Sequence, residues 1–341
     1  MTTEKILHPD TASLKRAAAV IRSGGLVAFP TETVYGLGGN ALDAEAAVKI
    51  YRAKGRPSDN PLIIHLADAR DAEKYCVTNE MFYRLADAFC PGPLTVILPK
   101  KDCIPYTVTG GLDTVAVRIP SHPIANALIR LAGVPIAAPS ANLSGKPSPT
   151  RFSHIEHDLD GRVDVLIDGG ECDFGVESTI VKPTDDGKGL HLLRPGGITI
   201  EMLLTVTDTV IPDKCLTEKL PEGTRPLAPG MMYRHYAPDA PLVLLEGSDE
   251  AFLSFVSEKL KAGEDCGVLC YDEDLAVLGE HRTISLGPKD ERNTQAHRLF
   301  ECLRAFPKVE RIYSRMPSRE GIGLAVFNRL IKAAGYCVIK L

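Results

Sequence analysis

Apolar and polar residues follow two periods along the chain, and together they predict an ordered series of helices and strands. The three- and four-residue spacing of a helix recurs over residues 10–23, 43–54, 80–88 and 123–131. Short apolar runs typical of buried strands separate these segments, at residues 26–29, 62–65, 94–98, 134–138 and 163–167, and residues 114–119 alternate as in a strand. Further short runs follow at residues 179–181 and 190–193. This mixture of strands and helices predicts an α/β fold.

The periodic pattern stops near Thr207 and resumes at Leu242, so the sequence predicts two domains joined by a linker. We expect a first domain over residues 1–207, a linker over 208–240 and a second domain over 241–341. In the last part, five apolar runs alternate with helical segments, at residues 242–245, 268–270, 283–286, 312–314 and 337–339. This alternation is typical of a small, Rossmann-like, mainly parallel α/β domain.

The linker has an unusual composition near its end. Residues 229–238 place Met, Tyr, Arg and His close together, with glycine or proline on either side. Long segments without periodicity are commonly functional lids or linkers. We expect this segment to act as a lid over the ligand site, and the alternative is a simple tether.

The composition narrows the range of functions. The 341 residues carry a net charge of −5, so any phosphate site has to be a local basic pocket in an acidic protein. Nine cysteines are scattered without a C-x-x-C pair, which argues for reduced thiols and against a structural zinc site. The sequence contains neither a signal peptide nor an apolar run of membrane-spanning length. We therefore expect a cytoplasmic protein with no membrane partner and no metal ligands of its own.

The segment after the second predicted helix is the strongest candidate for ligand binding. The helix that begins at Asp43 is expected to end at Gly55, so Lys54 and Arg56 flank its last turn. Two prolines stiffen the loop that follows, and the next strand ends in His65. A rigid loop with two cations suits the binding of an anion. The alternative is that both cations complement the helix dipole and lie in solvent.

Polar side chains also follow other predicted strands. Thr31 and Thr33 come directly after the first strand, and three glycines within residues 36–39 are expected to let the backbone turn with positive φ. Ser140 and Asn142 belong to a serine- and proline-rich loop after a later strand. Strand ends are where α/β proteins usually bind ligands. For the threonine loop alone, the alternative is a polar loop that caps itself. Taken together, the cations and hydroxyls at the strand ends indicate a protein that handles an anion or nucleotide.

Six sequence segments, taken together, resemble those of the YrdC-type L-threonylcarbamoyl-AMP synthases. In chain order they are G-G-L-V-A-F-P-T-E-T-V-Y-G-L-G, K-G-R-P-S-D-N-P-L-I-I-H, P-G-P-L-T-V-I-L, A-V-R-I-P, A-P-S-A-N-L-S-G and E-S-T-I-V. The linker run R-H-Y-A-P and the second α/β domain resemble the long, two-domain form of this family. The resemblance covers essentially the whole chain and implies a twisted α/β sheet that encloses a basic cavity.

The resemblance also implies a reaction. L-threonine, bicarbonate and ATP would give threonylcarbamoyl-AMP and pyrophosphate, with Mg²⁺ bound mainly through the phosphates of ATP. A separate threonylcarbamoyl transferase would then pass the group to adenosine in tRNA. The synthase itself is therefore not expected to hold nucleic acid stably.

By similarity to the family, the expected contacts divide by substrate. Lys54 and Arg56 are the expected catalytic residues. Threonine is expected to be held by Thr33, His65, Arg118 and Ser178. The expected ATP contacts are Arg56, Asn60, Thr114, Ser140, Asn142, Ser148, Arg194, Arg234, His235 and Tyr236.

Two functions from other classes compete with the enzyme. A basic cavity could serve an RNA-binding module, but the negative net charge and the aromatic content of 6% weigh against it. The second domain could alternatively make the chain a regulatory scaffold. Pyrophosphate release that requires both threonine and bicarbonate distinguishes the enzyme from both alternatives.

Overall fold

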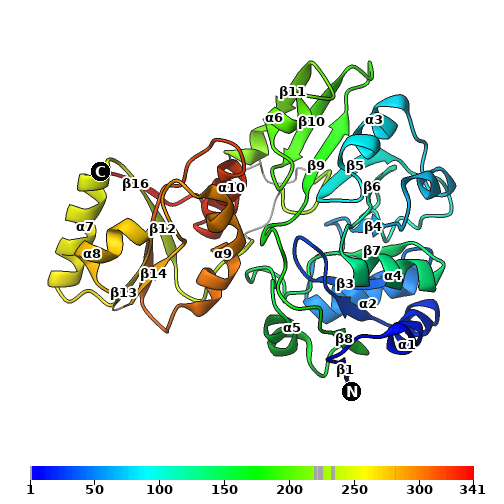
Figure 1. Cartoon of the computed structure of the whole chain (residues 1–341), viewed down its shortest axis with the longest axis horizontal. Coiled ribbons are helices and arrows are strands. Elements are labelled where there is room, and N and C mark those ends of the chain that lie inside the picture. The colour runs from blue at the N-terminus through cyan, green and yellow to red at the C-terminus, as the bar shows by residue number, and fades with distance from the viewer. Residues whose placement is uncertain (1, 219–220, 222–225, 232–234, 281) are drawn as a thin grey trace. The chain divides into compact units, whose positions relative to one another are not determined.

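The structure is a computed structural model that describes residues 2–218, 221, 226–231, 235–280 and 282–341. The chain divides into two compact units, each with a sheet of its own (Figure 1). The first unit comprises residues 1–144, 148–216 and 220–232. The second comprises residues 145–147, 217–219 and 233–341. The domain limits predicted at residues 207 and 240 stay predictions.

The first unit contains an eleven-stranded mixed sheet in the order β1-β8-β2-β3-β7-β4-β6-β5-β9-β10-β11. Its strands are β1 (Glu4–Ile6), β2 (Val27–Phe29), β3 (Gly36–Asn40), β4 (Ile63–His65), β5 (Leu94–Pro99), β6 (Thr114–Arg118), β7 (Ile136–Ala138), β8 (Val165–Ile167), β9 (Thr179–Pro183), β10 (Gly189–Arg194) and β11 (Thr209–Pro212). Strand β6 pairs parallel with β4 and antiparallel with β5. The two edge strands, β1 and β11, were not predicted, because short edge strands carry little apolar pattern.

Side-chain caps begin most helices of this unit, although α5 begins without one. Ahead of α1, the carboxylate of Asp10 accepts a hydrogen bond from the Ser13 N–H at 2.8 Å. Asp43 accepts from the Glu45 N–H at 2.9 Å ahead of α2, and Gly55, at φ 63°, ends α2 as predicted. The helices and 3₁₀ turns are α1 (Thr11–Arg22), α2 (Ala44–Lys54), η1 (Ala69–Lys74), α3 (Glu80–Phe89), α4 (Pro123–Ala132), α5 (Phe152–Leu159), α6 (Ile200–Leu203) and η2 (Lys214–Leu216).

A hydrophobic core joins α1 and α4 to the sheet. Ala17 and Ile21 of α1 and Leu128 of α4 are fully buried in it, together with Phe29 of β2 and Ile136 of β7. Burial of the larger of these side chains, such as those of Ile21, Leu128 and Phe29, stabilises a fold by roughly 1.5–3 kcal/mol each. This packing fixes the ends of β2 and β7, from which the polar loops of the candidate site emerge.

The prediction that the glycines after β2 form a turning loop is wrong. Residues 36–40 form strand β3, and Gly36, Gly38 and Gly39 all lie outside the positive-φ region. A Cβ atom on Gly38 would lie 2.6 Å from Cγ2 of Ile136 and 2.7 Å from Cε1 of Phe29. Glycine is needed at Gly38 because neighbouring side chains approach its backbone closely, and not because the chain turns.

The second unit contains a five-stranded, fully parallel sheet in the order β14-β13-β15-β12-β16. Its strands are β12 (Leu242–Glu246), β13 (Cys266–Cys270), β14 (Thr283–Ser285), β15 (Arg311–Arg315) and β16 (Val338–Lys340). Its helices and 3₁₀ turn are α7 (Asp249–Lys261), η3 (Asp272–Asp274), α8 (Leu275–Leu278), α9 (Arg292–Ala305) and α10 (Gly323–Ala333). The five predicted strands are all present, and the predicted α/β fold class is confirmed for both units.

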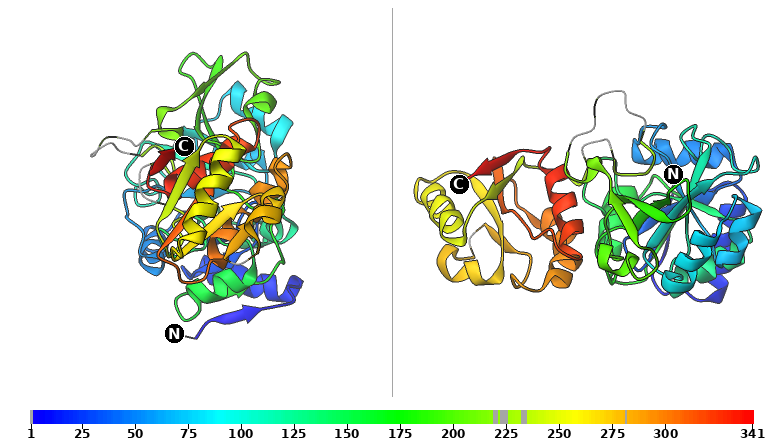
Figure 2. Two further views of the ribbon diagram at one scale, coloured as in Figure 1. Left: turned by 90° about the vertical axis from the view of Figure 1, so that its left-hand side faces the viewer. Right: turned by 90° about the horizontal axis from the view of Figure 1, so that it is seen from above.

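Helices cover both faces of this parallel sheet, with α7 and α8 on one face and α9 and α10 on the other (Figures 1 and 2). Successive residues of a strand point to opposite faces of the sheet. On the face covered by α7, Val243, Val268 and Tyr313 pack with Phe252 and Val256 of that helix. A parallel sheet has to be covered on both faces, which explains why its strands are continuous apolar runs.

Two expectations from composition concern the whole chain. All nine cysteines are free thiols, in agreement with the absence of a disulfide framework from the sequence pattern. Among the residues that the structure describes, no helix has both the length and the apolar character needed to cross a membrane.

Candidate active site

Strand register brings polar residues from three neighbouring strands into one row. His65, the last residue of β4, is paired with Arg118, the last residue of β6. On the other side, Arg118 is paired with Thr95 of β5. Directly paired residues share a face of the sheet. Thr95 in turn shares a hydrogen bond of 2.7 Å with the hydroxyl of Ser178, which immediately precedes β9. Three of the four predicted threonine contacts therefore belong to one array.

The loop after β2 joins this array through Thr31. Its hydroxyl donates to the carbonyl of Val34 at 2.6 Å and lies 2.9 Å from the hydroxyl of Thr33. The loop thus caps itself, as the alternative interpretation stated. One guanidinium nitrogen of Arg118 also reaches the Thr31 hydroxyl at 3.4 Å, so the self-capped loop lies against the array, with Thr33 next to it.

Arg118 forms a buried ion pair that was not predicted. Its Nη2 atom donates to Oε1 of Glu32 at 2.8 Å, and the two side chains are 5% and 2% exposed. Burial raises the pKa of Glu32, but the charge and the hydrogen bond of Arg118, together with the backbone groups of Glu32 and Ser121, lower the pKa overall. Glu32 is therefore ionised. The sequence feature that could have indicated this ion pair is the single carboxylate of Glu32 between Thr31 and Thr33, just after a strand.

His65 is held in its neutral form. Burial, with the neighbouring charge of Arg118 as the second cause, lowers the pKa of His65 to about 3. Its Nδ1 atom lies 3.3 Å from the carbonyl of Ile136, and its ring meets Phe29 edge to face at 6.3 Å. A neutral imidazole with one nitrogen facing a carbonyl can offer its other nitrogen to a ligand hydroxyl.

Lys54 is buried, and the interpretation that it lies in solvent at a helix end is wrong. Its side chain, 2% exposed, donates to the backbone carbonyls of Ser140 and Asn142. The hydroxyl of Ser140 donates to Oδ1 of Asn142 at 2.6 Å. The backbone N–H of Ser144 donates to the carbonyl of Lys54 at 2.9 Å. The structure thus brings together Lys54 and the predicted Ser-x-Asn pair, with Lys54 holding the loop.

Ser148 and Arg194 are each held by a buried neighbour. The Ser148 hydroxyl donates to Oε1 of Glu177 at 2.5 Å, and Glu177 is 5% exposed. Arg194, at the end of β10, donates through Nε to the carbonyl of Ser178 at 3.0 Å and through Nη2 to its hydroxyl at 3.1 Å. Because Glu177 and Ser178 are adjacent, these contacts link two predicted ATP residues to the threonine array. Glu177 and Thr95 were missed by the sequence analysis.

The remaining predicted ATP contacts of this unit lie at different distances from the array. Arg56 is half-buried and donates to the carbonyls of Asn60, at 3.3 Å, and Pro61, at 3.1 Å. Asn60 is buried, and its Oδ1 atom has no hydrogen-bond partner among the described residues. Thr114 begins β6, so it lies roughly 13 Å along the strand from Arg118. The register therefore separates Thr114 from the polar row.

The predicted linker contacts belong to the second unit. Arg234 lies outside the described residues. Tyr236 is buried, with its ring 5.2 Å from the ring of Phe300, and the guanidinium of Arg329 lies 5.8 Å from its ring centroid. The ring of His235 lies 5.5 Å from that of Tyr236. An ATP contact by these residues and the lid itself stay predictions.

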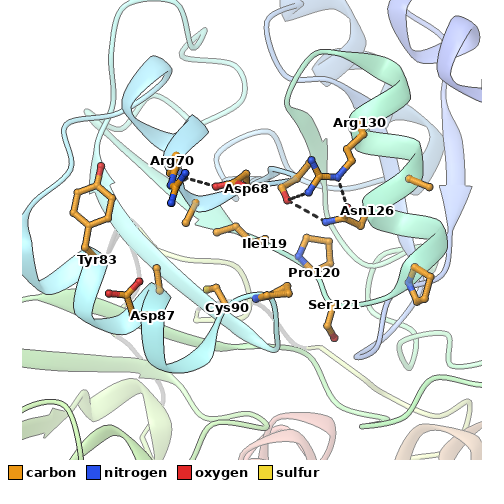
Figure 3. A pocket seen from close by; sticks show the side chains of 16 residues that line it. Asp68, Arg70, Tyr83, Asp87, Cys90, Ile119, Pro120, Ser121, Asn126 and Arg130 are labelled. Carbon is orange, nitrogen blue, oxygen red and sulfur yellow. Dashed lines mark hydrogen bonds between the residues drawn. The ribbon is translucent and has the colours of Figure 1, made fainter.

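An open groove of about 880 Å³ lies in the first unit, apart from the predicted contacts (Figure 3). None of the predicted site residues that the structure describes lines it, although it includes residues 119–121, which follow Arg118 directly. Arg130 donates to the side chain of Asn126 and to the carbonyl of Ala67, which fixes one wall. Among the described lining residues, two positive and two negative side chains offset one another in charge, namely Arg70, Arg130, Asp68 and Asp87.

The mixed sheet with a polar row at its strand ends belongs to a protein of the Sua5/YciO/YrdC class, as the family model shows. A sequence model of that family, described as telomere recombination, matches residues 19–196. A second model, described as the C-terminal domain of threonylcarbamoyl-AMP synthase, matches residues 198–335. The two matches together span most of the chain.

Comparison with individual proteins shows which members of this class the chain is similar to. The chain is 47% identical to threonylcarbamoyl-AMP synthase of Bacillus subtilis over 98% of its own length and 96% of that protein. It is 44% identical to the enzyme of the same name from Pyrococcus abyssi, over 96% of each chain. The chain therefore belongs to the threonylcarbamoyl-AMP synthase family and is an enzyme.

Solved structures agree with this assignment. The crystal structure of P. abyssi Sua5 complexed with L-threonine matches with a TM-score of 0.90 and 42% identity, over 100% of both chains. A double variant of the same protein, with a histidine and a tyrosine replaced by alanine, matches with a TM-score of 0.88 and 41% identity. That match covers 100% of this chain and 98% of the variant.

Lys54→Ala should destabilise the first unit. The substitution leaves one buried and one part-buried carbonyl without their donor, which costs about 1–3 kcal/mol in the free energy of unfolding. Arg52→Ala is the matched control, because Arg52 is an exposed cation in the last turn of the same helix. It should change stability by less than about 0.5 kcal/mol. Urea unfolding measures both, and equal effects would restore the helix-dipole interpretation.

His65 should make stability depend on pH. The pKa of His65 is about 3 in the folded protein, against an ordinary value of 6.5. Between these values the unfolded chain binds more protons, so the folded state loses stability as pH falls from about 6.5 towards 3. The steepest slope from one group is about 1.4 kcal/mol per pH unit.

The matched variants for this test are His65→Asn and His8→Asn, since His8 is exposed. Urea unfolding between pH 4 and 6.5 should give a shallower dependence of stability on pH for His65→Asn than for the wild type. His8→Asn should follow the wild type. Parallel slopes for the wild type and His65→Asn would contradict the buried, neutral imidazole.

Proposed function

We propose that this enzyme joins L-threonine, bicarbonate and ATP to form threonylcarbamoyl-AMP, with release of pyrophosphate. The observation that carries the proposal is the row of His65, Arg118 and Thr95 at the strand ends, in a chain that matches a threonine-bound relative along its whole length. An α/β protein binds its ligand at such strand ends. The names of the relatives support the same reaction.

The carboxylate and the side-chain hydroxyl of the amino acid each have a suitable neighbour in this proposal. The guanidinium of Arg118 binds the carboxylate, because arginine forms charge-assisted hydrogen bonds with this group. Neutral His65 and the hydroxyls of Thr33 and Ser178 bind the side-chain hydroxyl and exclude bulkier substrates. Arg194 and Thr95 orient the hydroxyl of Ser178. All four predicted contacts are buried, so water is largely excluded from the bound amino acid.

The substrates supply both nucleophiles in the proposed chemistry. The amine of threonine, after losing a proton, attacks the carbon of bicarbonate, and the carbamate forms with loss of water. A carbamate oxygen then attacks the α-phosphorus of ATP, and the bond to the bridging oxygen of pyrophosphate breaks. The protein has to align the two substrates and neutralise phosphate charge, which are the main tasks in transfers of this type.

The residues assigned to ATP suit that second task. Arg56 and Arg194 are the proposed phosphate ligands, and buried Lys54 adds positive charge while it holds the loop of Ser140 and Asn142. The unpartnered Oδ1 atom of Asn60 is an acceptor that the ligand can satisfy. We propose that Mg²⁺ is held mainly through the phosphate oxygens of ATP and supplies further charge neutralisation.

The product defines the next step. A mixed anhydride of a carbamate and AMP is an activated acyl donor, so a separate transferase has to consume it. We propose that this transferase passes the threonylcarbamoyl group to adenosine in tRNA, in the cytoplasm. A stable complex of the synthase with nucleic acid is not required.

The purified protein should release pyrophosphate only when Mg-ATP, bicarbonate and L-threonine are all present. Serine lacks the methyl group of threonine and should be poorer by about 10–200-fold in kcat/KM, the usual discrimination for one methyl. A coupled pyrophosphate assay measures both, and mass spectrometry identifies the adenylate. Reactions that lack one substrate at a time are the controls. Equal pyrophosphate release with and without threonine would refute the proposed function.

A further inference from the structure

Glu32 is one of two buried carboxylates in the site, and unlike Glu177, which holds Ser148, it contacts the cation of the polar row. It lies in the loop between β2 and β3, and it meets Arg118 at the end of β6, 86 residues later in the chain. The ion pair is 2.8 Å long, and both side chains are at most 5% exposed. No role for Glu32 follows from the binding residues considered so far.

The pair is incompletely satisfied. Oε2 of Glu32 and Nε of Arg118 are both buried and have no hydrogen-bond partner among the described residues. Transfer of two charges out of water costs several kcal/mol per ion, and the attraction offsets this only when the remaining donors and acceptors are also paired. An ion pair with an open donor and an open acceptor is therefore a poor stabilising element by itself. Such a pair is suited to a ligand that supplies the missing hydrogen-bond partners.

The contacts of Arg118 show which of its hydrogen-bond donors are already used within the protein. Among the described residues, only its Nη2 atom is engaged, by Glu32 at 2.8 Å and by the hydroxyl of Thr31 at 3.4 Å. Contacts at one end fix the plane of a guanidinium, while the other donors stay available. A carboxylate is recognised best by a planar, fixed guanidinium.

We propose that Glu32 is a positioning residue, which holds Arg118 in the orientation that receives the carboxylate of the substrate amino acid. The proposal rests on the proposed function, because it takes threonine as the substrate. The negative charge of Glu32 also offsets the positive charge of Arg118 before the zwitterionic amino acid binds. Arg118 therefore does not attract a phosphate group in its place. It acts on threonine binding through Arg118, and the ATP residues lie outside its contacts.

The first test compares Glu32→Gln with the wild type by calorimetric titration of L-threonine and by steady-state kinetics. The dissociation constant and the KM for threonine should rise at least tenfold, while the KM for ATP changes less than twofold. Inorganic phosphate should compete with threonine in Glu32→Gln more strongly than in the wild type. Glu45→Gln, at an exposed position of α2, is the control and should match the wild type.

The second test asks whether Glu32 acts through Arg118. Arg118→Ala should weaken threonine binding, and the double variant Glu32→Gln/Arg118→Ala should bind threonine no worse than Arg118→Ala alone. The double variant should also melt at a higher temperature than Arg118→Ala, because that single change leaves a buried carboxylate without its partner. Glu32→Asp, which keeps the charge, should recover part of the affinity lost in Glu32→Gln.

The outcomes separate this inference from the proposed function. If wild-type protein binds threonine and Glu32→Gln binds it equally well, the positioning role is wrong while the function stands. Additive losses in the double variant would also overturn it, because Glu32 would then act independently of Arg118. If the wild type shows no threonine-dependent pyrophosphate release, the proposed function itself fails.

Discussion

The register of β6 against β4 and β5 is the constraint on which the candidate site depends. Arg118 ends β6, and the register places His65 on one side of it and Thr95 on the other. A slip of one residue would turn every side chain of β6 to the opposite face of the sheet. It would also remove Arg118 from Glu32, leaving two buried charges unpaired. Electrostatics and strand pairing therefore support the same arrangement.

Lys54 holds the loop of Ser140 and Asn142 in place in the same way that Glu32 holds Arg118 in the row of polar residues. Each buried charge fixes the position of other polar groups: Lys54 holds the carbonyls of Ser140 and Asn142, and Glu32 holds Arg118. Such a site is organised before its substrates arrive. Pre-organisation of this kind matters for the proposed chemistry, in which the substrates supply the nucleophiles and the protein contributes mainly alignment and charge.

Local features of the fold were predictable from the sequence, and long-range ones were not. The cap at Asp43 and the glycine at the end of α2 depend on neighbours in the chain, so the pattern located that helix correctly. The burial of Lys54 depends on carbonyls about 90 residues later, which no local pattern contains. Gly38 was assigned to a turn because its real constraint, the side chains of Phe29 and Ile136, comes from other strands.

The same limit applies to the site and to the second unit. The family motifs named Arg118 and Ser178, but their partners Glu32 and Thr95 emerged only from the register and the loop packing. In the second unit, the five strands were predicted from their apolar runs. Their order, β14-β13-β15-β12-β16, was not, because it depends on which helices cross which face.

A crystal structure of this enzyme with L-threonine and a non-hydrolysable ATP analogue tests the central claim most directly. In that complex the carboxylate of threonine should contact the open donors of Arg118 while the contact between Arg118 and Glu32 is kept. The hydroxyl of threonine should lie against His65 and Ser178, with the α-phosphate facing the amine. Threonine bound away from Arg118, or a Glu32 side chain that leaves Arg118 when threonine binds, would contradict it.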